Sequence, residues 1–213
     1  MRRQPRNGAG RAEIAALAAR HLATSGARDF DDARRRAQEE LGLVGHRDVP
    51  DNREVQRALA DYLVLFQRSA LAARLARQRG AALLALEFFA PFAPRLCGPV
   101  WYGTACAHTP ISLHLTSDET EAVTRFLLDR RIPYHLSDAT CRFPGLAGPR
   151  RMPQFDVAID GEDFELVVFP SQGALRHPLS AIDDKPIKRV GRAELETLMA
   201  AGVLLADELD NGA

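Results

Sequence analysis

One short segment constrains the fold of this chain more than any other. Two apolar runs, 155–159 and 164–169, flank the dipeptide Asp160-Gly161. Asp-Gly readily adopts the positive φ angles that a tight turn between antiparallel strands requires. We therefore expect an antiparallel hairpin in the second half of the chain.

The chain changes character at Pro91 and Pro94. Before these prolines, apolar residues recur every three or four positions, which predicts helices at about 12–24, 31–41, 52–66 and 70–89. After them, apolar and alternating runs predict strands at 96–100, 111–115 and 132–136, and two helices at 118–129 and 192–200. We expect an α+β protein with a disordered tail over 1–10, a helical region over 11–80 and a small mixed α/β domain over 81–205.

Composition excludes several classes of protein. The 28 basic and 28 acidic side chains balance, so no global field draws the chain to nucleic acid or to an anionic membrane. The three cysteines are widely spaced, which argues against a disulfide framework and a thiolate zinc site. The longest apolar stretch, 81–92, contains Glu87 and is too short to span a bilayer. We expect a cytoplasmic protein without a membrane partner.

The stretch 98–115, GPVWYGTACAHTPISLHL, follows the last expected helix of the first half and ends in an expected strand. This order resembles the DNA polymerase β-like nucleotidyltransferase superfamily over roughly residues 81–170. In that superfamily, a strand ends in Gly-Ser, a second glycine follows, and the next strand carries Asp-x-Asp. A third carboxylate comes from a later antiparallel strand. Glycines of this kind let the backbone approach a triphosphate, and the three acids hold two divalent cations.

The resemblance assigns residues to each of these positions. Those implied to contact a nucleotide are Gly98 at the first glycine, Gly103 at the second, and Thr104 after it. Pro99 replaces the serine, and the carboxylate positions fall on Pro110, Ser112 and Glu165. Since neither proline nor serine replaces a carboxylate as a ligand of a hard cation, we expect standard two-metal catalysis to be lost. Mg²⁺ or Mn²⁺ is expected only if an altered site forms around Glu165.

Three further side chains are candidates for the same site. Ser112 and His114 share one face of the expected strand, so Ser112, His114 and Glu165 are the candidate catalytic residues. The alternative is that His114 only hydrogen-bonds a neighbour in a half-buried strand. Lys185 and Lys188, in the loop 183–189, are the only lysines and are candidate phosphate contacts. The alternative for them is a solvated charge cluster.

Three functions are consistent with these features. The first is a divergent protein of nucleotidyltransferase fold that binds a nucleotide, a nucleic acid or a protein partner without standard catalysis. The second is an active nucleotidyltransferase with an altered metal site around Glu165. The third is a structural interaction module that binds a protein partner through its N-terminal helices. Fold resemblance alone does not choose among them.

Overall fold

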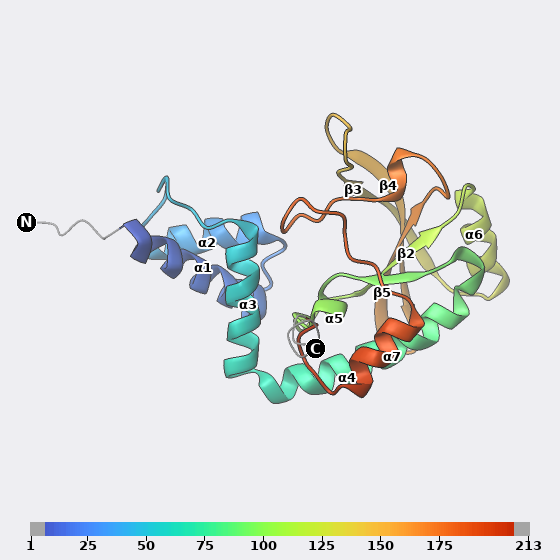
Figure 1. The fold of residues 1–213 in the computed structure, drawn as a ribbon, viewed down its shortest axis with the longest axis horizontal. Helices are drawn as coiled ribbons and strands as arrows, with labels where there is room; N and C mark the ends of the chain where they lie inside the picture. The colour runs from blue at the N-terminus through green and yellow to red at the C-terminus, as the bar shows by residue number, and fades with distance from the viewer. Residues whose placement is uncertain (1–6, 207–213) are drawn as a thin grey trace, which may run out of the picture. The chain divides into compact units, whose positions relative to one another are not determined.

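The computed structural model describes residues 7–206, which form two compact units (Figure 1). The first unit comprises the chain up to Leu71 with the short segments Cys106–His108 and Ala181–Asp183. The second comprises Ala72–Ala105, Thr109–Ser180 and the chain from Asp184 onward. The units divide within the helix α4 (Arg68–Phe88). Over the described residues, the protein is α+β, with seven α-helices and one five-stranded mixed sheet.

Three helices lie wholly within the first unit. These are α1 (Asn7–Thr24), α2 (Phe30–Leu41) and α3 (Asn52–Phe66). The side chains of Asp29 and Asp51 cap α2 and α3, each accepting a hydrogen bond from a backbone N–H of the first turn. α1 begins at Asn7, within the stretch 1–10 expected to be a tail. Residues 1–6 of the expected tail lie outside the described residues.

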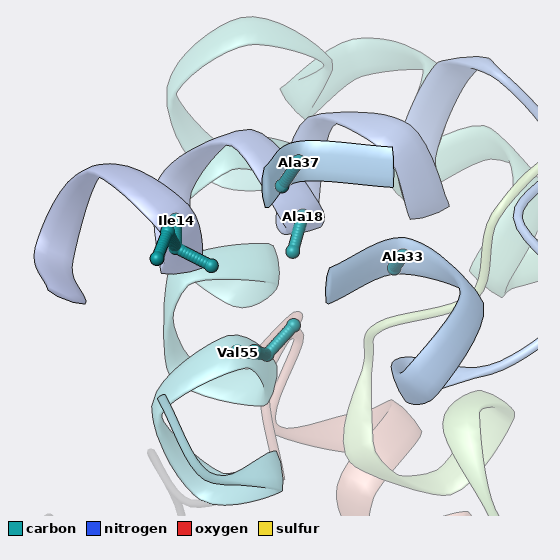
Figure 2. Packing of buried hydrophobic residues seen from close by; sticks show 5 residues of the cluster. All are labelled: Ile14, Ala18, Ala33, Ala37 and Val55. Atoms are coloured by element: carbon teal, nitrogen blue, oxygen red, sulfur yellow. The ribbon is translucent and has the colours of Figure 1, made fainter. Parts of the chain in front are cut away.

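Small apolar residues form the core of the first unit. Ile14 and Ala18 of α1 meet Ala33 and Ala37 of α2 and Val55 of α3 (Figure 2). All five are fully buried. Alanines at the contact positions let the helices approach closely.

The second unit is built on the mixed sheet. Its strands are β1 (Arg95–Cys97), β2 (Ile111–Thr116), β3 (Tyr134–Cys141), β4 (Arg150–Ile159) and β5 (Glu162–Phe169), in the spatial order β1-β2-β5-β4-β3. β2 and β5 run parallel, and every other neighbouring pair is antiparallel. The expected hairpin is confirmed as β4–β5, with positive φ at both Asp160 and Gly161.

Helices flank this sheet in the second unit. The later turns of α4 lie beside α6 (Thr120–Asp129) and α7 (Arg192–Ala200), as Figure 1 shows. The ring of Phe89, just after α4, packs against the ring of Phe126 of α6. Arg192 of α7 donates a hydrogen bond to the carboxylate of Glu87 of α4. Among residues 7–206, no helix is long and apolar enough to cross a membrane.

The strand expected over 96–100 is shorter than predicted. β1 ends at Cys97, and Pro99–Tyr102 forms the short helix α5 instead. Gly98 turns the chain with φ 73° and ψ −159°, a conformation open essentially only to glycine. Pro99 then occupies the first helical position, where its missing N–H removes no hydrogen bond.

Strand alternation gives the sheet two different faces. One face presents Ile111, Leu113 and Leu115 of β2, all fully buried. The opposite face presents Ser112 and His114 of β2, and Glu165 lies next to Ser112 on β5. We call this opposite side of the sheet the polar face. It carries the three candidate catalytic residues Ser112, His114 and Glu165.

Candidate functional site

A row of polar residues crosses the polar face where β2, β5 and β4 are adjacent. Ser112 is paired in register with Glu165 of β5, and Glu165 is paired with Asp156 of β4. All three side chains are half-buried, so they remain accessible to a small ligand. Two of the three expected catalytic residues, Ser112 and Glu165, are therefore neighbours. Asp156 lies next to Glu165, and the sequence analysis did not single it out.

Hydrogen bonds orient the two carboxylates of this row. Ser112 Oγ donates to Glu165 Oε2 at 3.4 Å. Asp156 accepts from Gln154 Nε2 at 2.7 Å and from Ser137 Oγ at 3.4 Å. Burial and the nearby charge of Asp156 raise the pKa of Glu165, and the hydrogen bond from Ser112 opposes this shift. Two acids side by side form a site suited to a proton, a cation or the hydroxyl and amino groups of a ligand.

Gly98 lies directly beside this row. A Cβ placed on Gly98 would be 3.6 Å from Ser112 Oγ, so the backbone of the turn after β1 approaches the Ser112 side chain closely. Gly98 is placed there because it follows Cys97, which is paired with Ser112 where β1 and β2 run antiparallel. The structure thus brings together Gly98, Ser112 and Glu165.

His114 is held in a different environment from Ser112. Its side chain is 7% exposed, and its ring lies 4.6 Å from the ring of Phe169. Burial, with the nearby positive charge of Arg189, lowers the pKa of His114 to about 3, so the ring is neutral at physiological pH. Its Nδ1 is buried without a hydrogen-bond partner among the described residues.

The chain between β5 and α7 brings one cation back to this face. Val190 forms an isolated antiparallel bridge with Leu96, with two backbone hydrogen bonds of 2.9 Å. This bridge places Arg189 opposite Cys97, in line with Ser112 and Glu165 across the sheet. Burial raises the pKa of the Cys97 thiol to about 12, with Arg189 acting against that shift, so the thiol is not a nucleophile.

Gly103 and Thr104 lie in a buried part of the fold. Gly103 ends α5 in the left-handed conformation, and a Cβ there would overlap the carbonyl oxygen of Leu204. Arg79 joins the two segments that meet here. It donates hydrogen bonds to the carbonyl oxygens of Val100 and Trp101 in α5, and of Val203 and Leu204 after α7. Thr104 is 4% exposed. These residues therefore fix the backbone after β1 and are not gathered with Gly98 at the polar face.

The two lysines lie in the loop that leads to Arg189. Lys185 and Lys188 are both exposed. The ammonium group of Lys188 lies 5.3 Å from the centre of the buried Trp101 ring, a cation–π contact. Of the three cations in the loop 183–189, Arg189 is the one that the Val190–Leu96 bridge carries to the sheet.

The residues present do not fit a two-metal centre. Over the part of the chain that the structure describes, no group of three or more His, Cys, Asp or Glu side chains is placed to hold a metal ion. Pro110 provides no side-chain ligand, and Ser112 offers only a hydroxyl group. The pair Glu165 and Asp156 supplies at most two carboxylates.

The position of Asp156 beside Glu165 could have been predicted from the sequence, through the register of the hairpin. A two-residue turn at Asp160-Gly161 pairs Ile159 with Glu162, and counting back three positions pairs Asp156 with Glu165. The position of Arg189 has no such signal, because it depends on a bridge formed after a long loop.

Comparison with known proteins adds no relative to this description. No protein-family model matches the chain, and neither the curated proteins nor the solved structures contain a significant match.

Proposed function

We propose that this chain is a divergent protein of nucleotidyltransferase fold that binds a nucleotide on the polar face and lacks standard two-metal catalysis. The observation that carries the proposal is the convergence of Gly98, Ser112 and Glu165. These are the first glycine, the second acid position and the third acid position of the pattern that the sequence resembles. Gly98 directly follows β1, Ser112 lies in β2, and Glu165 lies in β5, far along the chain.

The chemistry of the site supports binding more than transfer. In two-metal phosphoryl transfer, the cations stabilise both the attacking and the leaving oxygen, and they need several anionic ligands. Here Pro110 and Ser112 occupy two of the expected acid positions. Glu165 and Asp156 remain available to accept hydrogen bonds from ribose hydroxyl or base amino groups.

The alternative of an active enzyme is favoured by one feature. Asp156 adds a second carboxylate beside Glu165, which is the minimum for one loosely held Mg²⁺ or Mn²⁺ ion. Glu165 and Asp156 would be the ligands of that ion, and Ser112 would orient Glu165 through its hydrogen bond. A metal dependence of nucleotide binding would distinguish this alternative.

Thermal unfolding of the full chain with ATP, CTP, GTP or UTP, with and without manganese, tests the proposal. We expect at least one nucleotide to raise the midpoint, because a ligand that binds only the folded state stabilises it. The variant Ser112→Val should abolish the shift, and Thr140→Val, an exposed position on β3, should keep it. If none of the four changes the midpoint, the proposed binding is wrong.

A transfer assay separates the two candidate functions. With radiolabelled nucleotides and either Mg²⁺ or Mn²⁺, we expect no label on protein, RNA or a small acceptor. Label that appears in the wild type and disappears in Glu165→Gln would overturn the loss of catalysis and establish the altered-site enzyme instead.

A further inference from the structure

Three arginines lie at the β1 edge of the polar face, and the resemblance gives none of them a role. We propose that Arg95, Arg176 and Arg189 form a receptor for a phosphoryl anion. This inference deepens the proposed function, on which it rests for the identity of the nucleotide, because it names the groups that receive the phosphates. It assigns that role to arginines and not to Gly103, Thr104 or the two lysines.

Arg189 is the central member of this cluster. The Val190–Leu96 bridge holds its backbone against β1, and its side chain is half-buried. Its Nη2 lies 2.9 Å from Nδ1 of His177, so the hydrogen bond goes to a neutral acceptor and leaves the positive charge uncompensated. Burial lowers the pKa of Arg189, as do the charges of Arg176 and Arg95.

Arg95 approaches the same region from β1. It is paired in register with His114, so both residues belong to the polar face. Its Nη1 would lie 2.6 Å from a Cβ on Gly191, which shows that the guanidinium packs against the backbone two residues beyond Arg189. Arg176 comes from the short helix Ala174–Arg176, in the loop that follows β5.

Among the described residues, the three arginines differ from their neighbours in forming no ion pair. Within residues 7–206, none of the three forms an ion pair, whereas other arginines of the same unit do: Arg77 with Glu162, Arg142 with Asp184 and Arg192 with Glu87. Like charges gathered around a half-buried guanidinium destabilise the folded protein unless an anion accompanies them. A bound anion would remove the mutual repulsion and supply acceptors for several N–H groups.

A buried polar atom lies beside this cluster. His114 Nδ1 has no partner among the described residues, and His114 is the register partner of Arg95. Guanidinium groups bind phosphate oxygens through paired hydrogen bonds, which a single ammonium group cannot reproduce. The cluster is therefore suited to a phosphoryl group, and the adjacent Ser112–Glu165 pair to the uncharged polar part of the same ligand.

Calorimetric titration of the full chain with inorganic pyrophosphate tests the receptor directly. The wild type should bind pyrophosphate saturably at physiological ionic strength. Arg189→Gln and Arg176→Gln should each weaken binding roughly tenfold or more, the loss expected for one charge-assisted hydrogen bond. The control is Arg125→Gln, an exposed arginine of α6, which should bind like the wild type. Arg176 is exposed, so its replacement does not endanger the fold.

The outcomes separate this inference from the proposed function. Absence of saturable pyrophosphate binding, or unchanged affinity in both arginine variants, would overturn the receptor. If pyrophosphate binds through the arginines but no nucleoside triphosphate binds more tightly, the receptor stands for free phosphates and the nucleotide function fails. If a nucleotide binds equally well to the wild type and both variants, the nucleotide function stands and the arginine assignment fails.

Discussion

Ser112 and Glu165 face each other on adjacent parallel strands, with Ser112 Oγ 3.4 Å from Glu165 Oε2. They are 53 positions apart in the chain, and the packing of β5 between β2 and β4 brings them together. The carboxylate is half-buried beside a second acid, Asp156, which is an unfavourable place for a charge unless a ligand uses it. Such a locally unfavourable arrangement is typical of a functional site.

Replacing Glu165 should stabilise the protein in a pH-dependent way. The folded-state pKa of Glu165 is raised above its ordinary value of 4.5, mainly by burial. An acid with a raised folded pKa lowers stability as the pH rises past its unfolded pKa. Glu165→Gln should therefore unfold at higher urea concentration than the wild type at pH 7, and the difference should shrink below pH 4.5. Asp163→Asn, at an exposed position of the same strand, is the control, and an equal pH dependence in both variants would contradict the account.

Gly103→Ala should destabilise the second unit strongly. The new Cβ would overlap the Leu204 carbonyl in a residue with φ 87°, so the expected loss is more than about 3 kcal/mol. Gly202→Ala has a similar φ of 69° but meets no atom within 4 Å, and should lose only about 1 kcal/mol. Urea unfolding followed by the fluorescence of Trp101, the single tryptophan, measures both variants. Equal losses would mean that the contact with Leu204 is unimportant.

Removing the Arg79 side chain should also destabilise this part of the fold. Arg79 is buried, and its guanidinium donates to four backbone carbonyl oxygens, at distances from 2.7 to 3.3 Å. Arg79→Met leaves these acceptors unpaired, and we expect a loss of about 3 kcal/mol or more. Arg79→Lys should be intermediate, because an ammonium group cannot reach four diverging acceptors. The control Arg125→Met, on the exposed surface of α6, should change the urea midpoint little.

His114 should make the second unit sensitive to acid. Its folded-state pKa of about 3 is below its ordinary value of 6.5, mainly because the ring is buried. A histidine with a lowered folded pKa contributes stability that is present above pH 6.5 and lost as the pH falls toward 3. His114→Phe should therefore move the acid-unfolding midpoint, read from Trp101 fluorescence, to lower pH. An identical shift in His135→Phe, at an exposed position of β3, would show that the buried ring is not responsible.

Local signals in the sequence predict much of the secondary structure. The Asp160-Gly161 turn identifies β4 and β5, and the apolar periodicity of 192–200 predicts α7 at its observed bounds. The prediction of a strand over the whole of 96–100 is wrong, because Gly98 turns the chain and Pro99 begins a helix. The pattern of apolar residues contains no sign of either. The strand propensity of residues 96–100 is therefore overridden by Gly98, whose backbone conformation ends the strand.

The candidate site is only partly predictable, for a different reason. Ser112 and Glu165 follow from strand alternation and the resemblance, and Asp156 follows from hairpin register. Arg189 reaches the site through a bridge between residues 94 positions apart, Leu96 and Val190, which no local pattern indicates. Likewise, Gly103 has the spacing of a phosphate-binding glycine, yet the backbone of Leu204 lies against it. The position of Arg189 and the burial of Gly103 both depend on contacts made by the chain after the hairpin.

The most direct measurement of the central claim is a titration of the isotope-labelled full chain with a nucleoside triphosphate, followed by backbone amide NMR. We predict saturable shifts concentrated on the polar face and the β1 edge, above all at Gly98, Ser112, Glu165 and Arg189. Saturable shifts confined to the helices of the first unit, or no shifts at all with any of the four nucleotides, would contradict the account.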